Sequence, residues 1–400
     1  MYDLLGGLSI IEASSFVASP TAGLYCAQFG AEVIRVDQIG GGPDFRRWPV
    51  TAGNDSLYWE NLNRAKKSVA LDLSRPEGRE LLQQLVQATG QFITNFPVDG
   101  FLSHGILAKG RADLITVRIM GWADGSPALD YTVNNAVGYP MMTGAGPDPV
   151  NHVLPAWDLL SGAYAAFALL AAIRRREATG EGSEVCVPLS DVAIGTAANL
   201  GGIAEVLYSG ESRPRLGNAV YGLFGRDFVT RNDVRTMIVV VTHRQWANLV
   251  NALDLGDAIA AIETARGVSF ATNDGLRFQH RDALYPLFEN AIGARDHAEL
   301  AAALDAAGIV HSAYRDMIDA AHDPRLVQNN PIFSAFDTNP SGFAYPAAGA
   351  FGTVPQQQRG PVQPAPKNGQ HSEEVLVSRL NMSTGEIARL IDHGIIGTSS

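Results

Sequence analysis

The feature that most constrains the fold is a strand, a helix and a second strand within the first 37 residues. Residues 8–12 (LSIIE) are apolar enough for a buried strand, and residues 20–29 place small side chains on one helical face. Gly30 ends that helix, and residues 32–37 (EVIRVD) form the second strand. Such a unit favours parallel pairing with a right-handed crossover, so this opening predicts a parallel sheet.

The same alternation of strands and helices continues to residue 188. Strands are predicted at 68–73, 92–94, 114–119 and 184–188. Helices are predicted at 76–89, where a proline opens the first turn, and at 159–176. The stretch between 120 and 154 is rich in Gly, Pro and Asn and is predicted to be irregular. The predicted fold class is α/β, with a doubly wound, Rossmann-like large domain.

The character of the sequence changes after Gly217. The pattern predicts a hairpin from 224–230 and 236–241 and helices at 244–253, 276–292, 297–307 and 314–321, which together form a smaller α+β domain. From about 326 the chain is rich in Pro, Gly and Gln, and a last helix is predicted at 383–393. This tail either wraps a surface or another subunit, or is flexible. The predicted domains are therefore 1–200, 220–325 and 326–400.

Composition excludes several classes of protein. The 400 residues are 46% apolar and 18% charged, which excludes a disordered chain or a coiled coil. The formal net charge of −11 disfavours nucleic acid as a partner, because phosphate binding needs a surplus of Lys and Arg. Two cysteines, Cys26 and Cys186, provide neither a disulfide framework nor a zinc cluster. No export signal or membrane span is predicted, so we expect a cytoplasmic protein with no membrane partner.

The common nucleotide-binding and hydrolase motifs are absent from the sequence. Residues 13–20 (ASSFVASP), between the first strand and its helix, contain no G-x-G-x-x-G, which disfavours an NAD-type oxidoreductase. Asp37 ends the second strand, where a ribose-binding carboxylate would lie, but it is an isolated signal. The sequence contains no P-loop, H-E-x-x-H or G-x-S-x-G, and its histidines never have metal-ligand spacing.

Three segments carry groups suited to anions or to acyl chemistry. The glycines at 40–42, followed by Arg46 and Arg47, suit phosphate groups or form a tight turn with two surface arginines. Residues 63–68 (NRAKKS) form a second anion site or a solvated charged loop. Asp158 precedes an apolar helix and is predicted to be its N-cap. There the helix dipole would keep the carboxylate ionised, and helix N–H groups would stabilise an oxyanion if it attacked a carbonyl.

In these segments the chain resembles the class III CoA-transferases. No single motif is decisive, but the order and spacing of the matching segments are specific and cover essentially the whole chain. Besides the segment at Asp158, the matching segments are 8–49, 63–86, 92–106, 169–192 and 369–376. The resemblance implies a Rossmann-like large domain built from both chain ends, a smaller middle domain, and two chains threaded into an interlocked homodimer. It also implies that coenzyme A enters as part of an acyl-CoA substrate and that no other cofactor is used.

The resemblance implies roles for individual residues. Asp158 matches the family nucleophile, which attacks the thioester to give a mixed anhydride and then carries CoA as an aspartyl thioester. The residues expected to contact CoA are Val17, Ala18, Leu71, Asn95, Phe96 and Gly100. Basic residues that contact CoA in relatives are replaced here by Ser103 and Leu129, so Arg46 or Arg47 is expected to compensate.

Further segments match one subgroup of the family, which shifts CoA between the two carboxyl groups of a single C5 unsaturated diacid. These segments are 39–50, 130–134, 149–158, 217–228 and 360–366. The substrate keeps a free carboxylate, for which Arg47, His152 and Arg226 are candidate partners.

Three alternatives to this activity stay open. The first is an intermolecular transferase with separate donor and acceptor acids, and the second is a CoA-binding scaffold without activity. The third is an α-methylacyl-CoA racemase, a family branch that uses a histidine where this chain has Tyr131. A phenol with a pKa near 10 is a poor proton shuttle, so Tyr131 is instead a candidate to bind the substrate.

Overall fold

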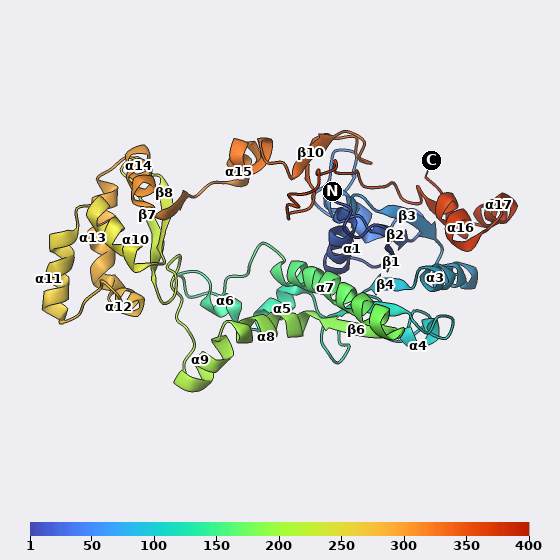
Figure 1. Ribbon diagram of the computed structural model, residues 1–400, viewed down its shortest axis with the longest axis horizontal. Helices are drawn as coiled ribbons and strands as arrows, with labels where there is room; N and C mark the ends of the chain where they lie inside the picture. The colour runs from blue at the N-terminus through green and yellow to red at the C-terminus, as the bar shows by residue number, and fades with distance from the viewer. Residues whose placement is uncertain (400) are drawn as a thin grey trace. The chain divides into compact units, whose positions relative to one another are not determined.

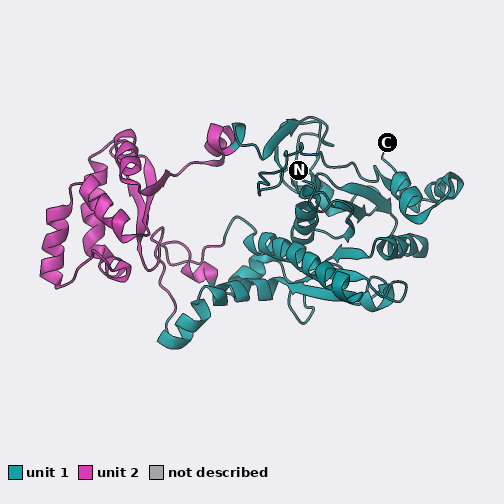
Figure 2. Ribbon diagram, in the orientation of Figure 1, with its two compact units in different colours: residues 1–138, 152–211, 327–400 teal, residues 139–151, 212–326 magenta. Residues whose placement is uncertain are grey.

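The computed structural model describes residues 1–399, which form two compact units (Figure 2). Unit 1 contains residues 1–138 and 152–211 together with the chain from 327 onward. Unit 2 contains residues 139–151 and 212–326.

Unit 1 is built on a mostly parallel sheet, which confirms the predicted α/β class. Within residues 1–399 this sheet has seven strands in the order β12-β3-β2-β1-β4-β5-β6. The terminal strand β12 pairs antiparallel with β3, and the other pairs are parallel. The strands are β1 (Ser9–Ala13), β2 (Glu32–Asp37), β3 (Lys67–Leu71), β4 (Gln91–Thr94), β5 (Ile115–Met120), β6 (Ser183–Pro188) and β12 (Ile396–Gly397).

Helices cover both faces of this sheet (Figure 1). Helices α1 (Ala18–Gln28) and α7 (Ala156–Thr179) pack against each other and against the strands on one face. Helices α3 (Pro76–Thr89) and α16 (Ser372–Leu380) pack together on the other face, because the β1–β2 crossover through α1 and the β3–β4 crossover through α3 run in opposite directions across the sheet. Among the described residues, α7 is the one helix long and apolar enough to cross a membrane, and it packs against α1, β5 and β6.

The close packing of α7 on α1 depends on small side chains. A Cβ atom at Gly162 would lie 2.5 Å from the backbone oxygen of Ala18, so only glycine permits this approach. Asp158 is one turn before Gly162 and therefore lies on the same helix face, toward the N-terminus of α1. The packing of two helices thus brings Asp158 to the segment that follows β1.

The remaining elements of unit 1 include some that the sequence pattern did not predict. The stretch between 120 and 154, predicted to be irregular, contains helix α5. The tail that begins at about residue 326 contains helix α16 and a hairpin of β10 and β11. These elements are short, so their periodicity is weak. The elements are α2 (Leu57–Asn63), α4 (His104–Leu107), α5 (Asp130–Ala136), α8 (Leu189–Asn199), α9 (Gly202–Ser209), α17 (Thr384–Asp392), β10 (Phe333–Phe336) and β11 (Tyr345–Ala348).

Unit 2 combines an antiparallel sheet with helices. The predicted hairpin is present, and a third strand, β9 (Val310–Ala313), pairs with β8. The helix predicted at 276–292 is wrong in extent, because it is divided at His280 into two helices. The other elements are β7 (Phe224–Val229), β8 (Arg235–Val240), α6 (Tyr139–Met142), α10 (His243–Ala252), α11 (Gly256–Arg266), α12 (Asp274–Gln279), α13 (Arg281–Gly293), α14 (His297–Ala307) and α15 (Met317–His322).

Candidate functional site

The topology of unit 1 places a candidate site at the carboxyl ends of β1 and β4. Strand β1 lies between β2 and β4, so the order of strands reverses there, and ligands of open α/β sheets bind at such a reversal. A cavity of about 350 Å³ opens at these strand ends. Its lining includes Ser14 and Ser15 after β1, Asp37 at the end of β2, and Phe96 after β4.

The loop after β1 is held in place from both sides. Asn95 accepts a hydrogen bond from the backbone N–H of Ser15 (3.1 Å) and donates to the carbonyl of Ser15 (2.9 Å). The next residue, Phe16, has a φ of +68°, a strained value for a bulky side chain. Its N–H donates to Oδ2 of Asp44 (2.8 Å). Asn95, expected to contact CoA, therefore also fixes the loop that would receive it.

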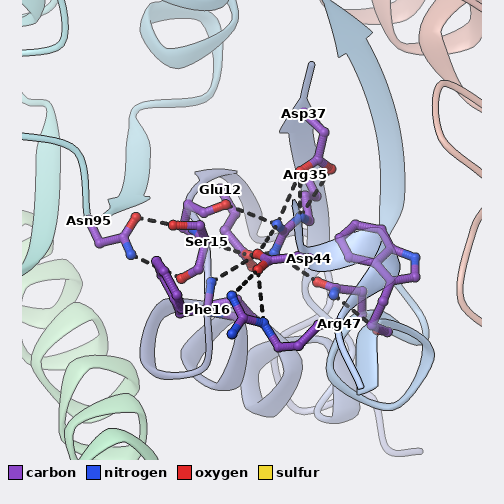
Figure 3. A network of polar contacts seen from close by, with 12 residues as sticks. Glu12, Ser15, Phe16, Arg35, Asp37, Asp44, Arg47 and Asn95 are labelled. Carbon is purple, nitrogen blue, oxygen red and sulfur yellow. Dashed lines mark hydrogen bonds and ion pairs between the residues drawn. The ribbon is translucent and has the colours of Figure 1, made fainter. Parts of the chain in front are cut away.

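A buried network of charges lies next to this loop (Figure 3). Arg35 is 1% exposed and pairs with Glu12 (3.0 Å) and Asp37 (3.0 Å). Its guanidinium also lies 3.6 Å from Asp44, and Lys66 pairs with Glu12 (2.8 Å). Because each buried charge has a partner, losing one partner would leave another charge unpaired, at a cost of about 3–5 kcal/mol.

The same contacts overturn the interpretation of residues 63–68 as an anion site. Lys66 is buried and its ammonium is engaged by Glu12 and by the carbonyl of Pro20 (2.8 Å). Arg64 is buried and donates to the carbonyl of Ala348. Lys67 pairs with Glu32 (2.7 Å). These cations stabilise the fold of unit 1, and the alternative of a solvated loop is also wrong.

Arg47 links the buried network electrostatically to Asp158. Its guanidinium pairs with Asp44 (2.9 Å) and stacks on the ring of Phe16 at 4.4 Å. It also lies 5.9 Å from the ring of Tyr58. Its positive charge acts on Asp158, whose pKa it lowers against larger opposing effects. Among the candidates for a substrate carboxylate, Arg47 is therefore one whose charge acts directly on Asp158.

Asp158 is not the N-cap of its helix, which corrects the sequence-based prediction. Helix α7 begins at Ala156 with Pro155 as its N-cap, so Asp158 is the third helical residue. The capping carboxylate is Asp130, whose Oδ2 accepts from the N–H of Trp157 (2.7 Å) and of Asp158 (3.1 Å). The cap comes from 27 or more residues away, so local sequence could not reveal it.

These hydrogen bonds also overturn the expectation that the N–H groups of α7 form an oxyanion site. Asp130 occupies the N–H groups of Trp157 and Asp158, and the N–H of Leu159 donates to the carbonyl of Pro155 (3.1 Å). The N–H of Ala156 donates to Leu154 (2.7 Å). The first turn of α7 therefore has no donor left for a substrate oxygen.

The pKa of the Asp158 carboxyl lies well above its ordinary value. Burial, followed by the like charge of Asp130, raises its pKa to about 7, and Arg47 opposes that shift. The prediction that the helix dipole keeps Asp158 ionised is therefore wrong in direction. A carboxyl with a pKa near neutrality, in a partly buried position, is typical of an active site.

Tyr58 is a candidate site residue that sequence reasoning missed. It is the second residue of α2, whose N-cap Ser56 accepts from the N–H of Trp59 (3.1 Å). Burial and then Asp158 raise the pKa of its phenol to about 12. The hydroxyl is therefore protonated at neutral pH, and it interacts electrostatically with Asp158. No local motif marks it, because only the fold brings α2 to α7.

The other residues expected to contact CoA have different surroundings. Val17 and Ala18 begin α1 and are buried, whereas Phe96 and Gly100 are exposed in the loop after β4. Leu71 ends β3 with its side chain fully buried in the core, so only its backbone is placed to meet a ligand.

The glycine turn and Arg46 lie beyond the end of β2. The N–H of Gly40 donates to the side chain of Asn368 (3.0 Å), which ties the turn to the returning chain. Arg46 is exposed at the end of the short 3-10 helix η1 (Pro43–Arg46). Its expected role toward phosphate stays a prediction.

The remaining substrate candidates fall into two places. His152 contacts Oδ1 of Asp130 through Nε2, and the ring of Tyr131 meets that of His152 edge-on at 5.6 Å. His152 and Tyr131 therefore lie near Asp130 in unit 1. Arg226 belongs to unit 2, where it pairs with Glu289 (2.9 Å). Among residues 1–399, no group of three or more His, Cys, Asp or Glu side chains is placed to hold a metal ion.

Known proteins and a solved structure are similar to this chain over most of its length. The model of CoA-transferase family III matches residues 5–372. The chain is 44% identical to the 2-methylfumaryl-CoA isomerase of Chloroflexus aurantiacus, over 99% of this chain and 98% of that protein. It is 30% identical to the succinate–glutarate CoA-transferase of Agrobacterium fabrum, over 72% of this chain and 79% of that protein. A crystal structure of a CAIB/BAIF family protein from Brucella suis superposes with a TM-score of 0.77 at 25% identity, covering 94% of this chain and 100% of that one.

Proposed function

The chain belongs to CoA-transferase family III, and from that premise we propose that it moves CoA between the two carboxyl groups of 2-methylfumaryl-CoA. The product is the isomeric thioester, mesaconyl-C4-CoA. The observation that carries this proposal is the 44% identity to a 2-methylfumaryl-CoA isomerase over nearly the full length of both chains. The intermolecular transferase, the alternative, has the weaker support of a 30% identical relative over 72% of the chain.

In the proposed mechanism, Asp158 is the nucleophile. Its ionised oxygen attacks the thioester carbon, the C–S bond breaks, and a mixed anhydride and CoA thiolate are formed. The thiolate attacks the aspartyl carbonyl of the anhydride, which gives an aspartyl-CoA thioester and the free diacid. The other carboxylate of the diacid then attacks the aspartyl thioester, and CoA thiolate leaves. Thiolate attack on the new anhydride completes the isomer and restores the Asp158 carboxylate.

Neighbouring side chains have supporting roles in this mechanism. In this mechanism the protonated Tyr58 hydroxyl donates to the oxyanion formed at either carbonyl, a role supported by its electrostatic interaction with Asp158 and by the occupation of the α7 N–H groups. Arg47 holds the carboxylate of the diacid that is not reacting. Asp130 keeps the first turn of α7 fixed and so holds the Asp158 backbone in position.

Retention of the diacid is what makes the transfer intramolecular. After the first exchange the small dianion has to reorient in the site, so that its second carboxylate faces the aspartyl thioester, before it escapes. Binding by an arginine gives the second carboxylate an effective concentration far above that of acids in solution.

The direct test is a single CoA ester incubated with purified protein and no added acid. We expect the isomeric CoA ester to appear on liquid chromatography, with no incorporation of isotope-labelled free mesaconate. A strict requirement for a second carboxylic acid, or rapid entry of label into the product, would assign the protein to the intermolecular class. Epimerisation of a saturated α-methylacyl-CoA, with no isomerisation of 2-methylfumaryl-CoA, would assign it to the racemases.

The proposed working form is an interlocked homodimer in the cytoplasm. Apolar side chains are exposed along α7, α8 and α9 of unit 1, where a second chain would cover them. The most exposed examples are Tyr164, Phe167, Leu200, Leu207 and Tyr208. Light scattering during gel filtration is expected to give twice the chain mass of 42.6 kDa. A monomer at micromolar concentration would contradict the proposal.

A further inference from the structure

A second cavity, formed entirely within unit 2, is lined by an unusual number of arginines. Its volume is about 520 Å³, within the usual range for small-molecule sites. The charged side chains in its lining are Arg215, Arg226, Arg235, Arg281 and Asp227. Four guanidinium groups thus face one carboxylate, in a chain whose net charge is −11.

Two of these arginines have acidic partners. Arg235 pairs with Asp227, and Arg226 pairs with Glu289 (2.9 Å), which is itself 48% exposed. In each ion pair one side chain is about half exposed to solvent. Both arginines therefore still line the cavity.

The other two arginines have no acidic partner. Within residues 1–399, no carboxylate lies within 4 Å of the guanidinium of Arg215 or Arg281. Arg281 donates to the carbonyl of Phe278 (2.9 Å) and stacks on its ring at 4.5 Å. Arg215 donates to backbone carbonyls, including that of Met141 (2.8 Å). Such contacts position a guanidinium but leave its charge uncompensated.

A buried hydroxyl in the same lining gives independent support. Tyr285 is 8% exposed, and its hydroxyl has no hydrogen-bond partner within the described residues. Leaving a buried polar group unpaired is costly, so an unpaired hydroxyl that lines a cavity points to a ligand that accepts from it. Burial raises the pKa of this phenol, which is therefore protonated and able to donate.

We propose that this cavity binds a phosphate or diphosphate group. A single carboxylate carries one negative charge and would be outnumbered by the arginines, whereas a phosphate ester or diphosphate carries two or more. Phosphate oxygens also match the forked geometry of guanidinium donors and accept from a phenol. The diphosphate of CoA and a free phosphate compound share this chemistry, and the experiment separates them.

Binding is measured first, with inorganic pyrophosphate as the probe. Isothermal titration of the full-length wild type without divalent cations is expected to show one saturable site per chain. Arg281→Ala is expected to weaken binding at least tenfold, because it removes a charged guanidinium, and Tyr285→Phe about threefold, because it removes one neutral O–H donor. The control is Arg266→Ala, an exposed arginine of unit 2 that does not line the cavity, which should bind as wild type does. Thermal unfolding of each variant checks that it is folded.

Competition then identifies the source of the phosphate. If CoA displaces pyrophosphate and pantetheine, which lacks phosphates, does not, the ligand is the CoA diphosphate. If CoA leaves pyrophosphate bound, the ligand is a free phosphate compound. No saturable binding, or equal binding in wild type, Arg281→Ala and Tyr285→Phe, would overturn the proposal. These measurements need no turnover, so they stand or fail independently of the proposed isomerase activity.

Discussion

Replacing Asp130 with asparagine tests whether that carboxylate controls the nucleophile. Asp158 has a pKa of about 7 because it is buried and because Asp130 is close. In Asp130→Asn the amide oxygen can still accept from the N–H groups of Trp157 and Asp158, and the amide nitrogen can donate to the ring of His152. The change therefore removes a charge and retains the hydrogen-bond geometry.

The expected result is a shift of the acidic limb of the pH profile to lower pH. In the proposed mechanism only ionised Asp158 attacks, so kcat/KM is expected to rise with pH through about 7 and to level off above it. At pH 6 about a tenth of the wild-type nucleophile is ionised. A like charge typically raises a carboxyl pKa by about one or more, so its removal should leave about half ionised at pH 6. The variant is then expected to be about fivefold faster than wild type at pH 6 and similar above pH 8.

The assay is conversion of the CoA ester, followed by chromatography at low substrate concentration between pH 5.5 and 8.5. Low substrate is essential because kcat/KM reports the free enzyme. Asp124→Asn is the matched control, since Asp124 is exposed and, within residues 1–399, its side chain accepts hydrogen bonds only from Ser126. A wild-type profile that is flat across this range would refute the raised pKa. A limb that moves to higher pH in Asp130→Asn would refute the role of Asp130.

The stability of Asp158→Asn gives an independent measure of the same pKa. A carboxyl whose pKa is raised from 3.8 to about 7 stabilises the fold below pH 3.8, and that contribution is lost as pH rises through about 7. The loss is about 4 kcal/mol, because each tenfold change in ionisation is worth about 1.4 kcal/mol. Wild type should therefore lose several degrees of thermal stability relative to the variant between pH 4.5 and pH 8. A constant difference between the two proteins would contradict this prediction.

Three further substitutions test the site. Asp158→Asn should abolish turnover and leave no enzyme-bound acyl group to be captured by hydroxylamine, which mass spectrometry checks. Arg47→Ala should raise KM far more for the CoA ester of a diacid than for the CoA ester of a monocarboxylic acid. Equal effects on both would indicate that Arg47 binds the CoA part of the substrate instead. Gly162→Ala puts a Cβ 2.5 Å from the backbone oxygen of Ala18, so it should lower both thermal stability and kcat, and a neutral result would contradict the close packing of α7 on α1.

Much of the fold followed from hydrophobic periodicity alone. The strands of the parallel sheet and helix α3 lie where the pattern predicted them, because each has a strong apolar repeat flanked by Gly or Pro. Helix α16 and strand β9 were missed because they are short and the chain around α16 is rich in Pro and Gly. The break between α12 and α13 was missed because the apolar repeat continues across it.

The site was predicted less completely, because its parts come from distant segments. Asp158 was identified by resemblance, but its environment was predicted wrongly, since the capping carboxylate Asp130 is far away in sequence. Tyr58 carries no motif and is recognised only once α2 and α7 are folded together. The pairing of Lys66 with Glu12 was likewise invisible, because a basic run looks the same whether it is solvated or buried.

The raised pKa of Asp158 also favours the proposed covalent intermediates. In the resting enzyme the ionised carboxylate is desolvated and lies near Asp130, and these two effects account for the cost of about 4 kcal/mol. An aspartyl anhydride or aspartyl thioester is uncharged, so burial and the like charge no longer penalise the side chain at position 158. Acylation thus relieves the strain that the fold imposes on the free carboxylate. Burial and Asp130, which leave about half of Asp158 protonated at neutral pH, therefore stabilise every acylated form of this side chain relative to its ionised form. The proposed mechanism passes through several acylated forms in each turnover, so this stabilisation acts on each of them.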